Sequence, residues 1–217
     1  MNTYTTVESC QIVGLAQIFD GVFGYKTDGE FVEVGAYDGL RWSNTYGLAH
    51  IGWKGLYIEP VEKYFNKCVV NHANHKNVTV VRALVSDAIK SMKIIVRQDM
   101  ATVDESFISM MNLRNGSYEA TITSSKLDDI LAAYNIPAFF DLLVIDVEGH
   151  EMSVLNGFDM WRYYPKMIII ETHAKNDNVV LRANAYNIDR HMRNHERCEY
   201  VRIYSDEINS VYVRTEY

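Results

Sequence analysis

The stretch from residue 31 to residue 60, FVEVGAYDGLRWSNTYGLAHIGWKGLYIEP, constrains the fold more than any other part of the chain. Residues 31–34 are apolar and β-branched apart from one acid, as in a short buried strand, and Gly35 follows directly. A second apolar run, 55–58, ends in Glu59. Between the runs, residues 43–45 are types that begin helices. Strand, glycine turn, helix, strand and acid in this order predict the first βαβ unit of a nucleotide-binding α/β domain.

The glycine pattern separates two kinds of cofactor. Dinucleotide-binding loops follow G-x-G-x-x-G, because a pyrophosphate sits on the helix N-terminus. Here Ala36 and Tyr37 stand in place of the second glycine, and the carboxylates of Glu33 and Asp38 would repel a pyrophosphate. They suit a ligand with an adenosine ribose and a cationic sulfonium, which is S-adenosylmethionine. An ordinary α/β turn that binds no ligand is the alternative.

Each part of this stretch has an expected task in binding the cofactor. Glycines at 35 and 39 permit backbone angles and a close approach that a Cβ would block. Glu59 is placed to accept hydrogen bonds from both ribose hydroxyls. Residues just after the third expected strand can lie against an adenine ring, although they could equally be plain core. The cofactor contacts predicted from these arguments are Glu33, Gly35, Ala36, Tyr37, Asp38, Gly39, Ser43, Asn44, Thr45, Glu59, Pro60, Ala83 and Leu84.

Length and charge exclude several classes of protein. The 217 residues suit one domain over 1–217, and the net charge of −7 predicts no general attraction to nucleic acid or to a membrane. Cys10, Cys68 and Cys198 are odd in number and lack metal-ligand spacing, which predicts free thiols in a reducing compartment. We find no signal peptide or apolar run that could span a bilayer, so we expect a soluble, cytoplasmic protein.

The rest of the chain alternates between strand and helix patterns. These patterns predict a Rossmann-like α/β fold: an open, mostly parallel sheet of about seven strands with one antiparallel strand and helices on both faces. Ser124 or Ser125 is expected to cap the helix that follows. The expected elements are a helical segment in 1–27 ending at Gly21 and Gly24, helices 61–74, 126–134, 151–156 and 179–197, strands 78–82, 92–96, 118–123, 141–145 and 167–170, and a hairpin over 199–214.

Two interpretations remain open within this pattern. The N-terminal helix is expected to cover core, with a role as a cap on the cofactor pocket as the alternative. Residues 97–116 form a long irregular segment that carries Met100, Met110, Met111 and Phe107. Long segments of this kind are often lids, and adaptable methionines can line a cleft. We therefore predict a lid or substrate wall, with an excursion packed on the surface as the alternative.

Polar side chains gather after two expected neighbouring strands. Asp146, Glu148 and His150 follow the strand 141–145, and Glu171 and His173 follow the strand 167–170. Ligands of open α/β sheets bind outside the carboxyl ends of the strands, so these groups should converge there. The alternatives are that Glu148 only caps the next helix and that His150 packs as a neutral core group.

Four blocks of the chain together resemble the FkbM family of class I S-adenosylmethionine-dependent methyltransferases, over roughly residues 28–175. The blocks are VEVGAYDG at 32–39, IEP at 58–60, SKLDDI at 125–130, and LVIDVEGHE at 143–151 followed by VLNG at 154–157. The family implies methyl transfer to a hydroxyl oxygen, often on a sugar or a secondary metabolite. It also implies a functional acid near the sulfonium methyl, at Asp146, with Val147 and Glu148 beside the cofactor. Tyr37 and His150 depart from the common family residues, so the acceptor cannot be carried over.

The chemistry of methyl transfer assigns roles to three of these residues. An alcohol acceptor needs a base or a divalent ion that lowers its pKa. Asp146, Glu171 and His173 could act without metal, with His173 as the base, or could hold Mg²⁺ or Mn²⁺. A small-molecule or glycan acceptor is the expected partner. Two other functions remain as alternatives, a non-catalytic module that binds S-adenosylmethionine or a nucleotide, and an NAD-dependent oxidoreductase.

Overall fold

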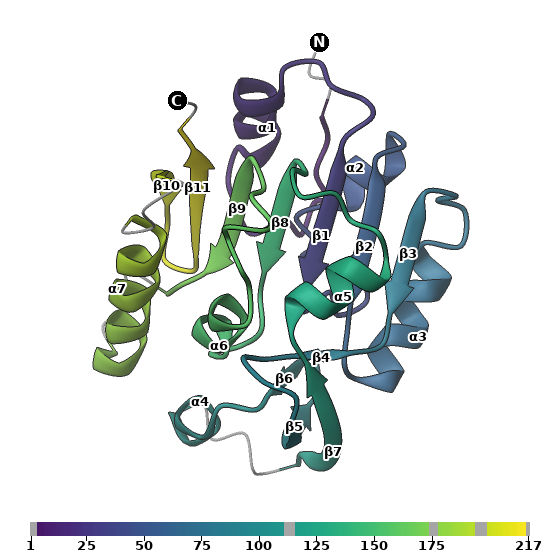
Figure 1. The fold of residues 1–217 in the computed structure, drawn as a ribbon. Coiled ribbons are helices and arrows are strands. Elements are labelled where there is room, and N and C mark those ends of the chain that lie inside the picture. The colour runs from purple at the N-terminus through teal and green to yellow at the C-terminus, as the bar shows by residue number, and fades with distance from the viewer. Residues whose placement is uncertain (1–3, 111–115, 174–177, 194–198, 216–217) are drawn as a thin grey trace.

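The computed structural model describes residues 4–110, 116–173, 178–193 and 199–215. Its larger sheet has seven strands in the order β10-β11-β9-β8-β1-β2-β3 (Figure 1). Neighbouring strands are parallel except at β11, which runs antiparallel to both β9 and β10. The predicted parallel sheet with one reversed strand and a C-terminal hairpin is therefore confirmed. The strands are β1 (Glu30–Val34), β2 (Lys54–Ile58), β3 (Val78–Val81), β8 (Leu142–Ile145), β9 (Met167–Glu171), β10 (Tyr200–Ser205) and β11 (Asn209–Arg214).

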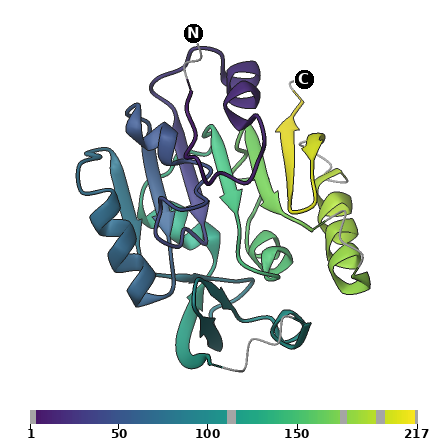
Figure 2. The ribbon, with the colours of Figure 1, turned by 180° about the vertical axis from the view of Figure 1, so that it is seen from behind.

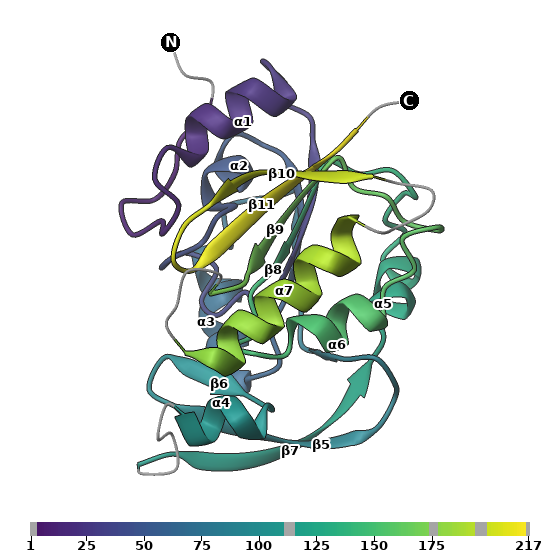
Figure 3. The ribbon, with the colours of Figure 1, turned by 90° about the vertical axis from the view of Figure 1, so that its left-hand side faces the viewer.

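Helices cover both faces of this sheet. Figures 2 and 3 show one group of three helices behind the sheet of Figure 1 and a second group on the opposite face. The first group is α1 (Leu15–Phe23), α2 (Tyr46–His50) and α3 (Glu62–Asn71), and the second is α5 (Leu127–Ala133), α6 (Glu151–Asn156) and α7 (Val179–Arg193). No helix in the described parts of the chain is long and apolar enough to cross a membrane.

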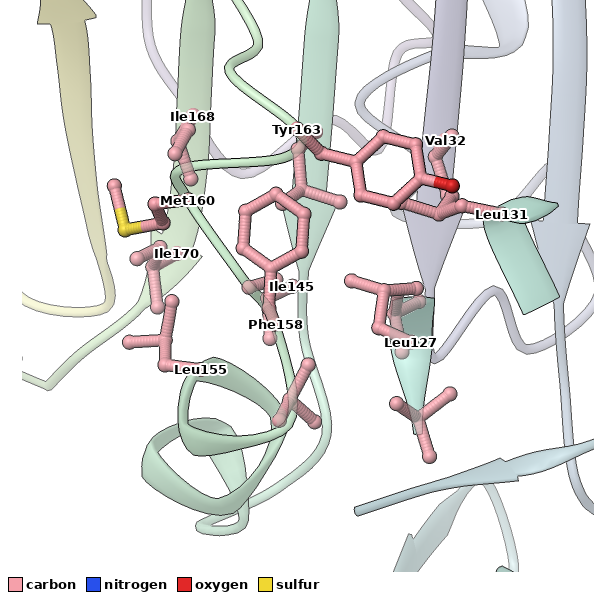
Figure 4. Packing of buried hydrophobic residues seen from close by; sticks show 14 of the residues in the cluster. Val32, Leu127, Leu131, Ile145, Leu155, Phe158, Met160, Tyr163, Ile168 and Ile170 are labelled. Atoms are coloured by element: carbon pink, nitrogen blue, oxygen red, sulfur yellow. The ribbon is translucent and has the colours of Figure 1, made fainter. Parts of the chain in front are cut away.

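The two faces of the sheet carry separate hydrophobic cores, because successive side chains of a strand point to opposite sides. Phe31 and Val144 pack with α1, α2 and α3, whereas Val32 and Ile145 pack with α5, α6 and α7. Burial on both faces explains why the central strands are continuous apolar runs. Figure 4 shows the second core, in which strand residues meet residues of α5, of α6 and of the segment after it: Val32, Ile145, Ile168, Ile170, Leu127, Leu131, Leu155, Phe158, Met160 and Tyr163.

A second, four-stranded sheet lies beyond the carboxyl ends of β1 and β8 (Figure 1). The predicted pairing of 92–96 with 118–123 is confirmed as an antiparallel ladder. The prediction that 97–116 is irregular is wrong for much of its length, because this part of the chain forms a strand against β5 and then a helix. The elements here are β4 (Leu84–Val85), β5 (Ser91–Arg97), β6 (Met100–Thr102), α4 (Glu105–Met110) and β7 (Tyr118–Ser125).

Several expected boundaries shift for identifiable reasons. The residue immediately before α5 is Lys126 and not a serine, because Ser124 and Ser125 belong to β7. The Ser124 hydroxyl instead donates to the carbonyl oxygen of Ala88 over 2.6 Å. The N-terminal helix begins at Leu15 and packs on the sheet. Met111, most of the segment 111–116, and the expected end of the helix at 197 lie outside the described residues, as does Cys198. Cys10 and Cys68 are free thiols.

Candidate active site

A cavity of about 280 Å³ lies at the carboxyl ends of β1, β2 and β8, between the larger sheet and the small one. The small sheet and its approaches contribute Ile94 and residues 99–103 to its wall. Most of the cofactor contacts predicted from sequence line this cavity: Glu33, Gly35, Ala36, Tyr37, Ser43, Glu59, Pro60, Ala83, Leu84, Asp146, Val147 and Glu148. The structure therefore brings the glycine loop, the acid after β2 and the acids after β8 to one place.

Gly35 allows this convergence. Its φ of 86° lies in the left-handed region, and a Cβ added there would stand 1.7 Å from the carbonyl oxygen of Asp146. The N–H groups of Gly35 and Ala36 both donate to the carbonyl oxygen of Ile58, over 2.9 and 3.1 Å. The turn after β1 thus lies against the ends of β2 and β8, so that position 35 has no space for a side chain.

Four of the predicted contacts do not line the cavity. The Asp38 carboxylate accepts the N–H groups of Leu40 and Arg41, over 3.1 and 2.8 Å, and so closes its own turn. Gly39 packs against α3 instead. Asn44 lies beside Cys10, with Oδ1 3.6 Å from its Sγ. The remaining residue, Thr45, donates its hydroxyl hydrogen bond to the carboxylate of Glu33 and holds that acid in place.

Glu59 is held rigidly at the end of β2. One carboxylate oxygen accepts the N–H of Tyr37 and the other accepts the N–H of Val61, each over 2.8 Å. The side chain lines the cavity, yet the residue is only 4% exposed. Burial raises the pKa of this carboxyl to about 8, and burial likewise raises the pKa of Glu33 to about 8. A ligand that brings hydroxyl donors or a positive charge to these acids would favour their ionised forms and so lower both pKa values.

Asp146, Glu148 and Glu171 form an acidic cluster at the other end of the cavity. One oxygen of each carboxylate lies within 4.8 Å of the others, and all three residues line the cavity. Burial raises the pKa of each, most strongly for Glu148 and Glu171, where the neighbouring carboxylates act in the same direction. Glu148 has a φ of 54°, an uncommon conformation for a residue with a side chain. A hydrogen bond of 2.6 Å from the hydroxyl of Thr102 to its carbonyl oxygen fixes that conformation.

The predicted trio of Asp146, Glu171 and His173 is only partly assembled. His173 lies beside Glu171, with Nε2 3.2 Å from Oε1 but not aligned for a hydrogen bond. His173 does not line the cavity, and Glu148 completes the cluster in its place. The physical reason is backbone direction, since His173 leaves β9 with a φ of 49° and its ring packs toward Phe107 at a centroid distance of 6.3 Å. Burial lowers the pKa of His173, which favours the neutral imidazole.

Glu151 is a residue of the site that our reasoning from sequence did not assign. It is 1% exposed, and its Oε1 accepts the N–H groups of Gly149 and Val147 over 3.0 and 3.3 Å. These bonds hold the loop after β8. Glu148, for which a cap of the next helix was the alternative role, does not cap α6, because the residue before that helix is His150 and α6 has no side-chain cap. Burial raises the pKa of Glu151 to about 7. The sequence signal for it is an acid in the first turn of a helix, where a carboxylate can accept free backbone N–H groups.

An aromatic group forms another part of the wall that the sequence did not reveal. The rings of Tyr37 and Trp42 stack at a centroid distance of 5.9 Å, and Tyr37 meets Tyr64 at 4.6 Å. The guanidinium of Arg41 lies 4.0 Å above the Trp42 ring and 3.4 Å from a carboxylate oxygen of Asp99. Gln11 reaches the cavity from the segment before α1, and α1 itself does not line it. His150 also lines it, with Nε2 3.0 Å from the hydroxyl of Ser86.

Solved structures share this fold. Cofactor-bound Rv0187 from MTB superposes with a TM-score of 0.51 and 14% identity, over 95% of this chain and 83% of that one. The O-methyltransferase TomG from Streptomyces achromogenes, in complex with SAM, superposes with a TM-score of 0.51 and 9% identity, over 93% and 78%. At these identities the likeness concerns the fold, which is that of the Rossmann-like methyltransferases. A search of curated proteins finds no match.

The family follows from the sequence. Residues 33–201 match the Methyltransferase FkbM domain, so the chain belongs to the FkbM methyltransferase family. The protein is thus an S-adenosylmethionine-dependent methyltransferase. The match covers the glycine loop, Glu59 and the acidic cluster, and it favours this function over the dinucleotide oxidoreductase and the non-catalytic module.

Proposed function

We propose that this protein transfers a methyl group from S-adenosylmethionine to a hydroxyl oxygen of a small acceptor, such as a sugar, a glycan or a secondary metabolite. The observation that carries the proposal is the acidic end of the cavity, where Asp146, Glu148 and Glu171 meet. Such a site favours the sulfonium of the cofactor and can also receive the proton of an alcohol. The motif blocks shared with the FkbM family support oxygen as the acceptor atom.

The reaction is an in-line displacement. A lone pair of the acceptor oxygen attacks the methyl carbon, the carbon–sulfur bond breaks, and S-adenosylhomocysteine leaves with the electron pair. The hydroxyl proton passes to a carboxylate, for which Asp146 is the candidate because it lines the cavity at the end of β8. Glu171, beside Asp146 in the cluster, is the next carboxyl that could receive the proton, and the neutral His173 lies 3.2 Å beyond it without being aligned for a hydrogen bond. Alignment of the reacting atoms supplies the rest of the rate.

The cofactor is proposed to extend from Glu59 to Asp146. Both oxygens of Glu59 accept one backbone hydrogen bond each, and each keeps a lone pair for a ribose hydroxyl. Ala83 and Leu84 line the cavity where an adenine ring would lie beyond the ribose. Glu33, held by Thr45, is within the same cavity and offers a carboxylate to the ammonium group.

Calorimetry and a transfer assay test the proposal. The protein should bind S-adenosylmethionine and S-adenosylhomocysteine, and should not bind NAD comparably. A panel of methyl glycosides and phenols, incubated with cofactor labelled on the methyl group, should yield labelled methyl ethers and S-adenosylhomocysteine. Label on nitrogen, sulfur or carbon would contradict the oxygen acceptor. Cofactor binding with no transfer to any member of the panel would favour the non-catalytic module.

A further inference from the structure

We propose that Asp146, Glu148 and Glu171 together hold one divalent cation of the Mg²⁺ or Mn²⁺ kind. This inference deepens the proposed function, on which its catalytic purpose rests: a bound cation would lower the pKa of the acceptor hydroxyl, and Asp146 would then hold the ion while the hydroxyl proton passes to water. The binding itself needs neither cofactor nor acceptor. The ligand set differs from the one that the sequence indicates, because Glu148 replaces His173. All three ligands are carboxylates, and oxygen donors are the ones that these hard cations select.

The three carboxylates of the cluster lie close together. One oxygen from each carboxylate lies within 4.8 Å of the others. Two oxygens bound to one Mg²⁺ ion stand about 3.0 Å apart in adjacent positions and about 4.2 Å apart in opposite positions, given the usual metal–oxygen bond length. The three carboxylates are therefore close enough for side-chain rotations to bring one oxygen of each onto a single ion. Three protein ligands leave room for water or for an acceptor oxygen.

One carboxylate oxygen of Glu171 has no hydrogen-bond partner. Oε1 of Glu171 faces His173, but Oε2 accepts no hydrogen bond, although the side chain is only 7% exposed. The carboxyl group of Asp146 beside it can share a hydrogen bond with Glu171 only when one of the two acids is protonated. A buried polar atom without a partner destabilises the folded state. This oxygen belongs to a side chain that lines the cavity beside Asp146 and Glu148, so a cation there would satisfy it.

The wall of the cavity carries little positive charge to balance the acidic cluster. Among the described residues that line the cavity, Arg41 carries the one guanidinium or ammonium group, and it pairs with Asp99 at 3.4 Å. The acidic cluster thus has no basic side chain from the cavity wall as its counterion. Buried carboxylates are usually paired with a charge or coordinate a metal.

The test titrates the full chain, stripped with a strong chelator, with Mn²⁺ alone and follows the free ion by electron paramagnetic resonance. We expect one bound Mn²⁺ per chain, displaced by excess Mg²⁺. Glu148→Gln should weaken this binding at least tenfold, whereas His173→Gln and the exposed Glu62→Gln should leave it within about twofold. Circular dichroism spectra should show that each variant is folded.

No stoichiometric Mn²⁺ binding, or binding that Glu148→Gln leaves intact, overturns the inference. Binding lost in His173→Gln but kept in Glu148→Gln would restore the set that the sequence indicates and would also overturn it. Because the assay contains neither S-adenosylmethionine nor an acceptor, a failed transfer assay with normal Mn²⁺ binding would count against the proposed function alone. Should Glu148→Gln fail to fold, Asp146→Asn replaces it with the same expected loss.

Discussion

The backbone N–H of Tyr37 donates a hydrogen bond of 2.8 Å to Oε2 of Glu59, across the gap between the glycine loop and the end of β2. The acid that we expect to bind the cofactor ribose therefore also holds the loop that surrounds the cofactor. Its second oxygen is bound to the N–H of Val61 over 2.8 Å. Glu59 thus has a structural contribution beside the binding contribution that we expect.

Glu59→Gln should weaken S-adenosylmethionine binding by about 1–3 kcal/mol, because it replaces charge-assisted hydrogen bonds by neutral ones. Its carbonyl oxygen can still accept one of the two backbone hydrogen bonds. Isothermal titration calorimetry measures the change, with Glu62→Gln as the matched control on the exposed start of α3, where Glu62 only pairs with Arg82. Equal affinities of the Glu59→Gln variant and the wild type would remove Glu59 from the ribose site.

Asp146→Asn should lower turnover by about 10²-fold or more, the usual contribution of a positioned acid–base group. Cofactor affinity should change less, because the shape of the side chain is retained. Steady-state kinetics with the labelled cofactor measure both effects, and the exposed Glu207→Gln is the control. Near-normal turnover in both Asp146→Asn and His173→Ala would refute the catalytic site as proposed.

The described part of the segment 97–116 should behave as a lid despite its secondary structure. Residues 99–103 line the cavity, and the segment is tied to the larger sheet by the Thr102–Glu148 hydrogen bond and the partly exposed Arg41–Asp99 pair. Amides of 98–110 should exchange quickly in the free protein and more slowly with cofactor and acceptor bound. Hydrogen-exchange mass spectrometry checks this, with β8 as the internal reference. Slow exchange that ligands leave unchanged would identify a fixed wall.

His72 should make the protein less stable as the pH falls. Its Nε2 lies 2.8 Å from the carbonyl oxygen of Gly39, and burial lowers its pKa to about 4, below the value of 6.5 for an exposed histidine. The unfolded chain therefore binds more protons than the folded one between these values, so this contribution is complete above pH 6.5 and is lost toward pH 4. Between pH 7.5 and pH 5 the loss should be about 1–2 kcal/mol.

A difference measurement isolates His72 from the buried acids, whose raised pKa values act in the opposite direction. The unfolding free energy of the wild type minus that of His72→Gln, from urea melts, should shrink by this amount over the same pH range. A difference that stays constant with pH would show that His72 does not titrate on unfolding.

Much of the fold could be read from local sequence. The continuous apolar runs of β1, β8 and β9 require burial on both faces, and Gly35 is the residue type that a left-handed turn between crowded strand ends demands. The alternation in β10 and β11 likewise predicts a hairpin, which the register confirms. These features depend on neighbours in sequence, so they are decided before the chain packs.

The tertiary structure alone decided which polar groups face the cavity. His173 was directed toward Phe107 while Glu148 entered the acidic cluster, and both residues have a positive φ. Asp38 turned into its own loop, where its carboxylate accepts the N–H groups of Leu40 and Arg41. β6 pairs with β5 across the short turn at Gln98 and Asp99, a local hairpin that no glycine in the sequence indicates, because Gln98 itself has a φ of 55°. Position after a strand brings a residue to the correct edge, but the direction of its side chain depends on torsions that are set by residues far away in the chain.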